Sequence, residues 1–326
     1  MTWLRTLAVL AGLGVAAWLA WEVGPAALIG ELRRLSWRLG LLMLPQALVS
    51  VLDAAGWRYG FPGRLPPLGP LITMRLAGEA VSDTTPTGTL GGDALKAWLA
   101  GRAGIPLRDG LVSVVVAKTA LVGSQVLFLV QGLALVAIGP APSRGLHAVL
   151  AILAGVGALA SAGFVWAQRH GLFRVGGRAL GWLGLPGGAT GAAARLDEDL
   201  RTYYRERRGR LLWSVALHLL GWMVGALEVW LALGFLGVPI PMSTALVIEA
   251  AATGIRSAGF LVPGSLGIQE GGLVGIFAAL GLGGSMGLTF GVIRRIREAV
   301  WALAGYACLV AWRAPGRPRV RRPPTA

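Results

Sequence analysis

Charged residues stand inside or beside long apolar segments of this chain, and their types and spacing are suited to ion pairing or to holding a charged ligand. They are Asp93, Lys118, Glu228, Glu249, Arg256, Glu270, Arg294, Arg295, Arg297 and Glu298. On insertion scales, a charge at the centre of a bilayer costs at least about 2.5–3.5 kcal/mol. We therefore expect these residues to pair with one another or to face water.

Two interpretations of these charges are compatible and stay open. In the structural one, Glu270 pairs with an arginine of the last apolar segment and Asp93 pairs with Lys118, as buried clamps. In the functional one, the charges line a polar cavity for a charged head group. The residues assigned to that cavity are Asp93, Lys118, Glu249, Arg256, Gln269, Glu270, Arg294, Arg295, Arg297 and Glu298.

The last apolar segment carries the densest charge. Arg294 and Arg297 are three residues apart, so they share a helix face, with Glu298 four residues after Arg294. Arg295 is rotated away by about 100°. A basic pair of this kind suits bidentate contact with phosphate or carboxylate, and predicts an anionic or zwitterionic lipid head group as occupant. The alternative is that Arg294 or Arg295 reaches the membrane interface.

Sequence motifs for catalysis are absent. The chain has no P-loop and no zinc motif, so we expect neither an enzyme nor a cofactor or metal site. Its one cysteine, Cys308, excludes a disulfide framework. On its apolar segment, His218 is expected to be a satisfied core histidine rather than a proton carrier.

Composition sets the class of the protein. Of 326 residues, 55% are hydrophobic and 14% are charged, against about 25% charged in soluble domains. This excludes both a soluble fold and a disordered chain. The net charge of +15 invites a nucleic-acid role, but the basic residues lie between apolar segments. The fold class expected is an all-α polytopic membrane protein.

Segments of about 20 apolar residues predict membrane-spanning helices. Six are expected, at 3–21, 39–56 (interrupted by Pro45), 111–138, 146–167, 211–236 and 287–312. The first could be a signal peptide, but Trp18, Leu19 and Trp21 crowd the cleavage point, which favours an uncleaved span.

Two further apolar regions, 70–100 and 244–283, contain glycine, proline and acidic residues. Irregular backbone at membrane depth is tolerated only inside protein or beside a wet cavity. Both regions are therefore predicted to be broken or re-entrant helical hairpins. The residues placed at the breaks are Pro86, Gly91, Gly92, Pro263, Gly264 and Gly267.

The sequence predicts an inverted repeat with units 39–138 and 211–312, inside one membrane domain of residues 1–312. In both units an acid, Asp93 or Glu270, follows a proline by seven residues and precedes a base, Lys118 or Arg295, by 25. Such repeats place the substrate site at broken helices between the units.

Arginines set the expected orientation. They concentrate in the loop 168–210 and the tail 313–326, which should therefore be cytoplasmic, as should both termini. The charges of residues 22–38 fit this topology poorly. Within the basic loop, LDEDLRTYYRERRGRLLW predicts an amphipathic helix lying on anionic lipid.

Three stretches carry a resemblance: GEAVSDTTPTGTLGGDALKAWLA, IEAAATGIRSAGFLVPGSLGIQEGGLVGIFAALGL and VIRRIREAVW. The sequence resembles the flippase-like transmembrane domain of lysylphosphatidylglycerol synthases, and is more similar to stand-alone members associated with hopanoid biosynthesis. Near the first motif the family's asparagines are replaced by Ser82, Asp83 and Thr84. The motif residues carried over are Asp93, Pro263, Gly267, Gln269, Glu270, Arg295 and Glu298.

This resemblance implies a bacterial inner-membrane protein that translocates a lipid or lipid-linked molecule, such as a hopanoid, a hopanoid precursor or a phospholipid, between leaflets. Membrane lipids are the expected partners, and a homodimer and lipid-biosynthetic enzymes are further candidates. Two alternatives stay open: a non-transporting scaffold for lipid (hopanoid) biosynthesis, and an intramembrane lipid enzyme that uses Asp93 or Glu270 as acid or base.

Overall fold

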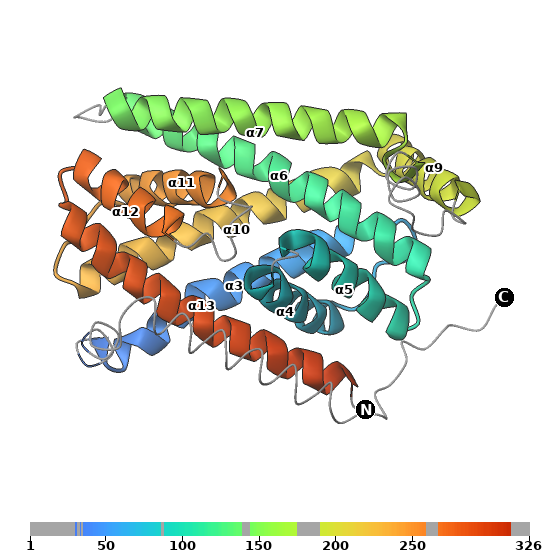
Figure 1. Cartoon of the computed structure of the whole chain (residues 1–326), viewed down its shortest axis with the longest axis horizontal. Coiled ribbons are helices and arrows are strands. Elements are labelled where there is room, and N and C mark those ends of the chain that lie inside the picture. Colours follow the sequence, from blue (N-terminus) through green and yellow to red (C-terminus); the bar gives the residue numbers. More distant parts are fainter. Residues whose placement is uncertain are drawn as a thin grey trace.

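The computed structural model describes residues 35–85, 88–138, 144–174, 190–258 and 267–313, with the isolated residues 30 and 33. Within these ranges the chain forms helices and turns and no strand (Figure 1). The helices are α3 (Arg38–Tyr59), α4 (Leu68–Thr84), α5 (Gly88–Arg102), α6 (Leu107–Ile138), α7 (Arg144–His170), α9 (Thr190–Glu206), α10 (Arg208–Phe235), α11 (Met242–Ala258), α12 (Ile268–Ala279) and α13 (Gly284–Arg313).

Four helices of the described ranges, α3, α6, α7 and α10, are long and apolar enough to cross a membrane. They confirm the spans predicted at 39–56, 111–138, 146–167 and 211–236. Helix α13 has 30 residues and covers the predicted span 287–312, but its charges exclude it from the purely apolar set. The predicted span 3–21 lies outside the described residues. The protein is therefore a multi-pass, all-α membrane protein.

Pro45 does not interrupt α3, as the sequence had suggested, because the helix runs through it without ending. A proline inside a helix removes one backbone hydrogen bond. In α3 this loss is offset by extensive packing against α10. The two helices are antiparallel: Arg38 at the start of α3 lies over the ring of Phe235 at the end of α10, and Tyr59 stacks with Trp213 at the opposite end.

Two hairpins, α4–α5 and α11–α12, enter the bundle from opposite ends of α10. Helix α4 follows the loop whose Phe61 and Gly63 carbonyls accept hydrogen bonds from Arg210, at the start of α10. Helix α11 begins shortly after α10 ends. The far ends of α4 and α11 then meet, because Arg256 of α11 pairs with Asp83 of α4 at 3.2 Å. The predicted hairpins therefore correspond to α4–α5 and α11–α12, and the C-terminal ends of α4 and α11, here called the hairpin tips, face each other.

The packing of the two hairpins is reciprocal. Helix α4 packs along α13, the last helix of the second unit, and α11 packs along α6, the last helix of the first (Figure 1). The apolar core is divided in the same way, with one cluster of buried residues around α4–α5 and a larger one around α11–α12. This is the arrangement that an inverted repeat requires, and the repeat itself stays a prediction.

Close backbone approach holds the first hairpin together. A Cβ atom on Gly92 of α5 would lie 2.1 Å from the carbonyl oxygen of Gly78 on α4. Gly91 and Gly92 were predicted at the break, but both lie inside α5. Their physical role is different from the one expected, because at Gly92 the missing side chain allows two helices to touch.

The amphipathic helix predicted in the basic loop corresponds to α9, which ends at Glu206 before α10 begins. Its apolar face does not lie on lipid as expected. Leu200 and Tyr203 are fully buried against Val112 and Val116 of α6. The apolar periodicity was correctly recognised, but the surface that α9 covers belongs to the protein itself.

Candidate functional site

Three groups of charged and polar side chains connect helices α3–α6 and α10–α13 within the described ranges. The α13 cluster comprises Asp83, Glu228, Glu249, Arg256, Gln269, Glu270, Arg294, Arg295, Arg297 and Glu298. The α5–α6 group comprises Asp93, Lys96 and Lys118. The α3–α10 cluster comprises Asp53, Arg75, Glu79 and His218.

Three arginines of α13 pair with three different helices. Arg294 pairs with Glu249 of α11, Arg297 pairs with Glu228 of α10, and Arg295 pairs with Glu270 of α12 at 2.5 Å. The roughly 100° step per helical residue aims the three side chains in different directions. Arg294, Arg295 and Arg297 are 3%, 2% and 7% exposed. Helix α13 is therefore tied by ion pairs to three of its neighbours.

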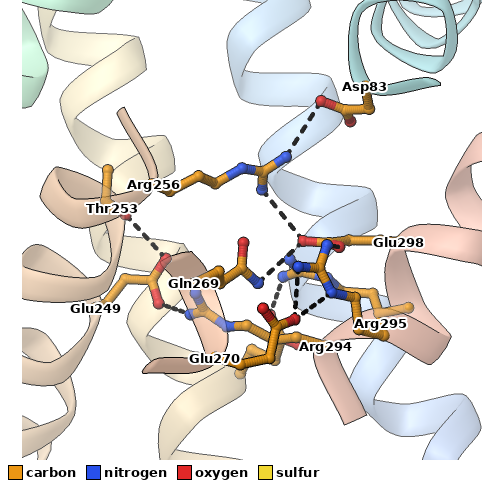
Figure 2. A network of polar contacts seen from close by, with 11 residues as sticks. Asp83, Glu249, Thr253, Arg256, Gln269, Glu270, Arg294, Arg295 and Glu298 are labelled. Atoms are coloured by element: carbon orange, nitrogen blue, oxygen red, sulfur yellow. Dashed lines mark hydrogen bonds and ion pairs between the residues drawn. The ribbon is translucent and has the colours of Figure 1, made fainter. Parts of the chain in front are cut away.

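The sequence-based view of the α13 face needs one correction. Arg294 and Arg297 were expected to form a basic pair with Glu298, and Arg295 was expected to point elsewhere. Instead, Glu298 accepts a hydrogen bond from Arg295 at 2.8 Å, and Gln269 donates to Glu298 at 3.3 Å (Figure 2). Arg294 and Arg297 pair instead with carboxylates on α11 and α10. Helical spacing along α13 alone does not reveal these partners.

Glu270 has two structural roles. One of its oxygens accepts a hydrogen bond from the Gly267 backbone N–H at 2.8 Å, and the other accepts from Arg295 Nε at 2.6 Å. The first contact caps α12, where Gly267 has a positive φ of 73° that favours glycine. Gly267 therefore stands directly before α12, and its assignment to the break of the second hairpin stays a prediction. The other predicted break residues of the two hairpins, Pro86, Pro263 and Gly264, lie outside the described residues.

Arg256 and Asp83 form the open side of the α13 cluster. Arg256 extends between the two hairpins and contacts Asp83 at 3.2 Å and Glu298 at 3.4 Å (Figure 2). The side chains of Arg256 and Asp83 are 34% and 49% exposed. Unlike the arginines of α13, this acid and this base are both accessible, and each comes from the tip of a different hairpin.

The α5–α6 group contains the acid–base pair predicted from spacing. Asp93 lies 3.5 Å from Lys118 and 2.5 Å from Lys96. Asp93 with Lys118 and Glu270 with Arg295 have the same separation in sequence, and both join the second helix of a hairpin to the helix that follows it. The clamps expected under the structural interpretation are thus present.

Sequence reasoning missed the α3–α10 cluster and the role of Asp83. Arg75 contacts both Asp53, at 2.5 Å, and Glu79, and His218 contacts the other oxygen of Asp53 at 2.7 Å. The available signal was that Asp53 and His218 both lie in apolar spans that had to pack together. For Asp83, the signal was its place in the motif where the family has asparagine.

The α13 cluster carries both signs of charge, and its accessible side is the Arg256–Asp83 pair. Its five carboxylates and four guanidinium groups are Asp83, Glu228, Glu249, Glu270 and Glu298, and Arg256, Arg294, Arg295 and Arg297. Chemically, the buried pairs fix the positions of helices, whereas Arg256 and Asp83 can exchange their mutual contact for contacts with a phosphate and an amine.

Residues 5–305 match the family described as the lysylphosphatidylglycerol synthase TM region. The chain belongs to this family. The match covers nearly the whole chain and includes all three charged groups, so the ion-paired core lies within the family's membrane region. That region is flippase-like and is not the catalytic domain of the synthases. No curated protein and no solved structure matches the chain.

Proposed function

We propose that this protein moves an amphiphilic lipid between the two leaflets of a bacterial inner membrane, with the lipid head group passing between the hairpin tips. The observation that carries the proposal is the accessible Arg256–Asp83 pair, which joins the ends of two hairpins that enter from opposite sides. A head group that crosses the hydrocarbon core needs polar partners at mid-depth.

The charges favour a head group that carries both signs. A phosphate would take the place of Asp83 on the guanidinium of Arg256, which has the planar geometry for two hydrogen bonds. An amine would take the place of Arg256 on the carboxylate of Asp83. Because the α13 cluster has one more carboxylate than guanidinium groups, it suits a zwitterionic head group better than a purely anionic one.

The three arginines of α13 have a supporting role in this proposal. Each is buried and already neutralised by a carboxylate, and breaking such a pair costs several kcal/mol. They hold α10, α11 and α12 in place, whereas the hairpin tips exchange partners. This differs from the sequence-based expectation, in which Arg294, Arg295 and Arg297 held the head group directly.

The predicted inverted repeat would allow the protein to open toward either leaflet. If the two units alternate in opening, the tips give access to each leaflet in turn. The side that contains α9 and the start of α6 is assigned to the cytoplasm because its arginines are numerous. Movement would be passive or coupled to an ion gradient.

A gene-deletion strain tests the proposal against its alternatives. Lipid extracts give total composition, and a membrane-impermeant amine reagent gives the share of aminolipids in the outer leaflet. The proposal predicts unchanged composition and a changed outer-leaflet share, restored by the wild-type gene. A changed lipid product with an unchanged leaflet share would indicate an enzyme instead. A normal leaflet share together with normal composition would refute translocation and favour a scaffold.

A further inference from the structure

His218 is a buried histidine with only one ring nitrogen in contact with a partner. It is 4% exposed, and its Nδ1 lies 2.7 Å from Oδ1 of Asp53. The other ring nitrogen, Nε2, is buried without a hydrogen-bond partner. The expectation of a fully satisfied core histidine is therefore not met, because one titratable nitrogen remains.

The surroundings of His218 fit the ring closely. A Cβ atom on Gly56 of α3 would lie 2.8 Å from Nε2, and one on Gly221 of α10 would lie 3.1 Å from Oδ1 of Asp53. Ser214 of α10 also joins the two helices here, because its hydroxyl donates a hydrogen bond to the Gly56 carbonyl at 2.9 Å. Side chains larger than glycine at these two positions would displace the imidazole or the carboxylate.

The charged side chains around the ring would be balanced by one additional proton. Asp53 from α3 contacts the ring directly, Arg75 and Glu79 from α4 lie behind Asp53, and Lys96 of α5 acts on Asp53 at longer range. Within the described ranges, α6, α9 and α11 contribute no hydrogen bond or ion pair to the ring. With a neutral imidazole, the α3–α10 cluster has two carboxylates and one guanidinium. Lys96 is paired with Asp93, so a proton on His218 balances the charges of these four side chains.

We propose that His218 and Asp53 form a proton-binding site whose occupancy controls how firmly Arg75 holds the first hairpin to α3. In the neutral state Nδ1–H donates to Asp53 and Nε2 is bare. Proton uptake places the new proton on Nε2 and turns the ring into an imidazolium, with its Nδ1–H still donated to Asp53.

Asp53 is the shared partner through which the proton acts. Its two oxygens divide between His218 and Arg75. An imidazolium attracts the carboxylate of Asp53 more strongly than a neutral ring does. The ion pair between Asp53 and Arg75 is weakened as a result. Arg75 then relies on Glu79, four residues further along the same helix, and α4 is less firmly attached to α3. This coupling rests on the proposed function, whereas proton binding does not.

Proton binding can be measured directly, because the chain has only three histidines. The double variant His147→Gln/His170→Gln changes two residues at the ends of α7 and leaves His218 as the single histidine. In ¹⁵N-histidine NMR of the full chain in nanodiscs, recorded over a series of pH values, we expect the His218 ring signals to show that Nε2 takes up a proton as the pH falls. A ring that stays in one state throughout overturns the proposal.

Asp53→Asn identifies the partner. We expect it to weaken proton binding at His218 about tenfold, because the stabilising charge is removed. An unchanged transition overturns the role of Asp53. If Asp53→Asn does not fold, Arg75→Gln supplies the test: removing a competing cation should strengthen proton binding at His218, and unchanged proton binding contradicts the shared-partner scheme.

The coupling step needs a transport readout. The probe is a fluorescently labelled phosphatidylethanolamine in phosphatidylethanolamine–phosphatidylglycerol vesicles containing the full chain. We expect the wild-type rate to change with pH over the range of the NMR transition, and His218→Gln to move lipid at a rate that no longer follows pH. Equal pH profiles overturn the coupling. If the wild type moves no lipid, the proposed function fails, and the NMR result alone decides proton binding.

Discussion

Replacing Glu228 by glutamine should reveal how strongly the buried ion pairs stabilise the bundle. Glu228 is 1% exposed and its partner Arg297 is buried too. Removing one partner of such a pair destabilises by about 3–5 kcal/mol, because the other charge stays buried without compensation. Glutamine keeps the shape and one acceptor oxygen, so we expect the lower end, about 3 kcal/mol.

The assay is equilibrium unfolding in mixed detergent–SDS micelles, followed by tryptophan fluorescence. The matched control is Glu198→Gln on α9, which changes the same chemical group at a site that is 63% exposed and paired with Arg201. Exposed pairs are screened by solvent and contribute about 0–1 kcal/mol. Glu228→Gln/Arg297→Gln should be less destabilised than Glu228→Gln alone. If Glu228→Gln behaves like Glu198→Gln, the buried pair does not secure α13 to α10.

Two further predictions concern helix contacts. Gly92→Ala places a methyl group 2.1 Å from the Gly78 carbonyl oxygen, so α4 and α5 must separate, at a cost of about 1–3 kcal/mol in unfolding free energy. Tyr204→Phe removes hydrogen bonds to Thr119, at 3.1 Å, and to Gln168. Helix α9 should therefore lose about 1–2 kcal/mol of local stability, and its amide hydrogens should exchange faster. Burial raises the pKa of Tyr204 from 10.0 to about 12, so wild-type stability should fall between those pH values, and Tyr204→Phe should show a smaller fall.

Each of these has its own control. Gly101→Ala, also on α5, meets no atom within 4 Å and should be neutral or slightly stabilising, because alanine favours helix. A destabilisation equal to that of Gly92→Ala would show that the close approach is unimportant. For α9, Tyr59→Phe leaves the contacts of Tyr204 unchanged. Exchange rates in Tyr204→Phe that match those of Tyr59→Phe would contradict the anchoring role of the Tyr204 hydroxyl.

The spans and the two simplest clamps followed from the sequence. Apolar length predicts α3, α6, α7 and α10, because a bilayer core demands about 20 apolar residues per helix. The pairs Asp93–Lys118 and Glu270–Arg295 were within reach because both join neighbouring helices. Partner choice on α13 was not, since it depends on which of three packed helices presents a carboxylate to each arginine.

Contacts between distant segments were the least predictable. The apolar face of α9 was predicted to lie on lipid, and only tertiary packing shows that α6 covers it. Asp53 and His218 are 165 residues apart, and nothing in their local sequence states that α3 and α10 touch there. Asp83 was visible only as a departure from a family motif, yet it meets Arg256 where the hairpin tips face each other.

Lipid movement by purified protein in vesicles tests the central claim most directly. The measurement is the fraction of a fluorescently labelled zwitterionic phospholipid that becomes accessible to an impermeant quencher over time. It compares protein-free vesicles, wild type, Arg256→Gln and the control Arg205→Gln, at an exposed position on α9. We predict rapid movement with the wild type and with Arg205→Gln, and a rate at least tenfold lower with Arg256→Gln (about 1.4 kcal/mol). Equal rates for wild type and Arg256→Gln, or a wild type no faster than protein-free vesicles, would contradict the account.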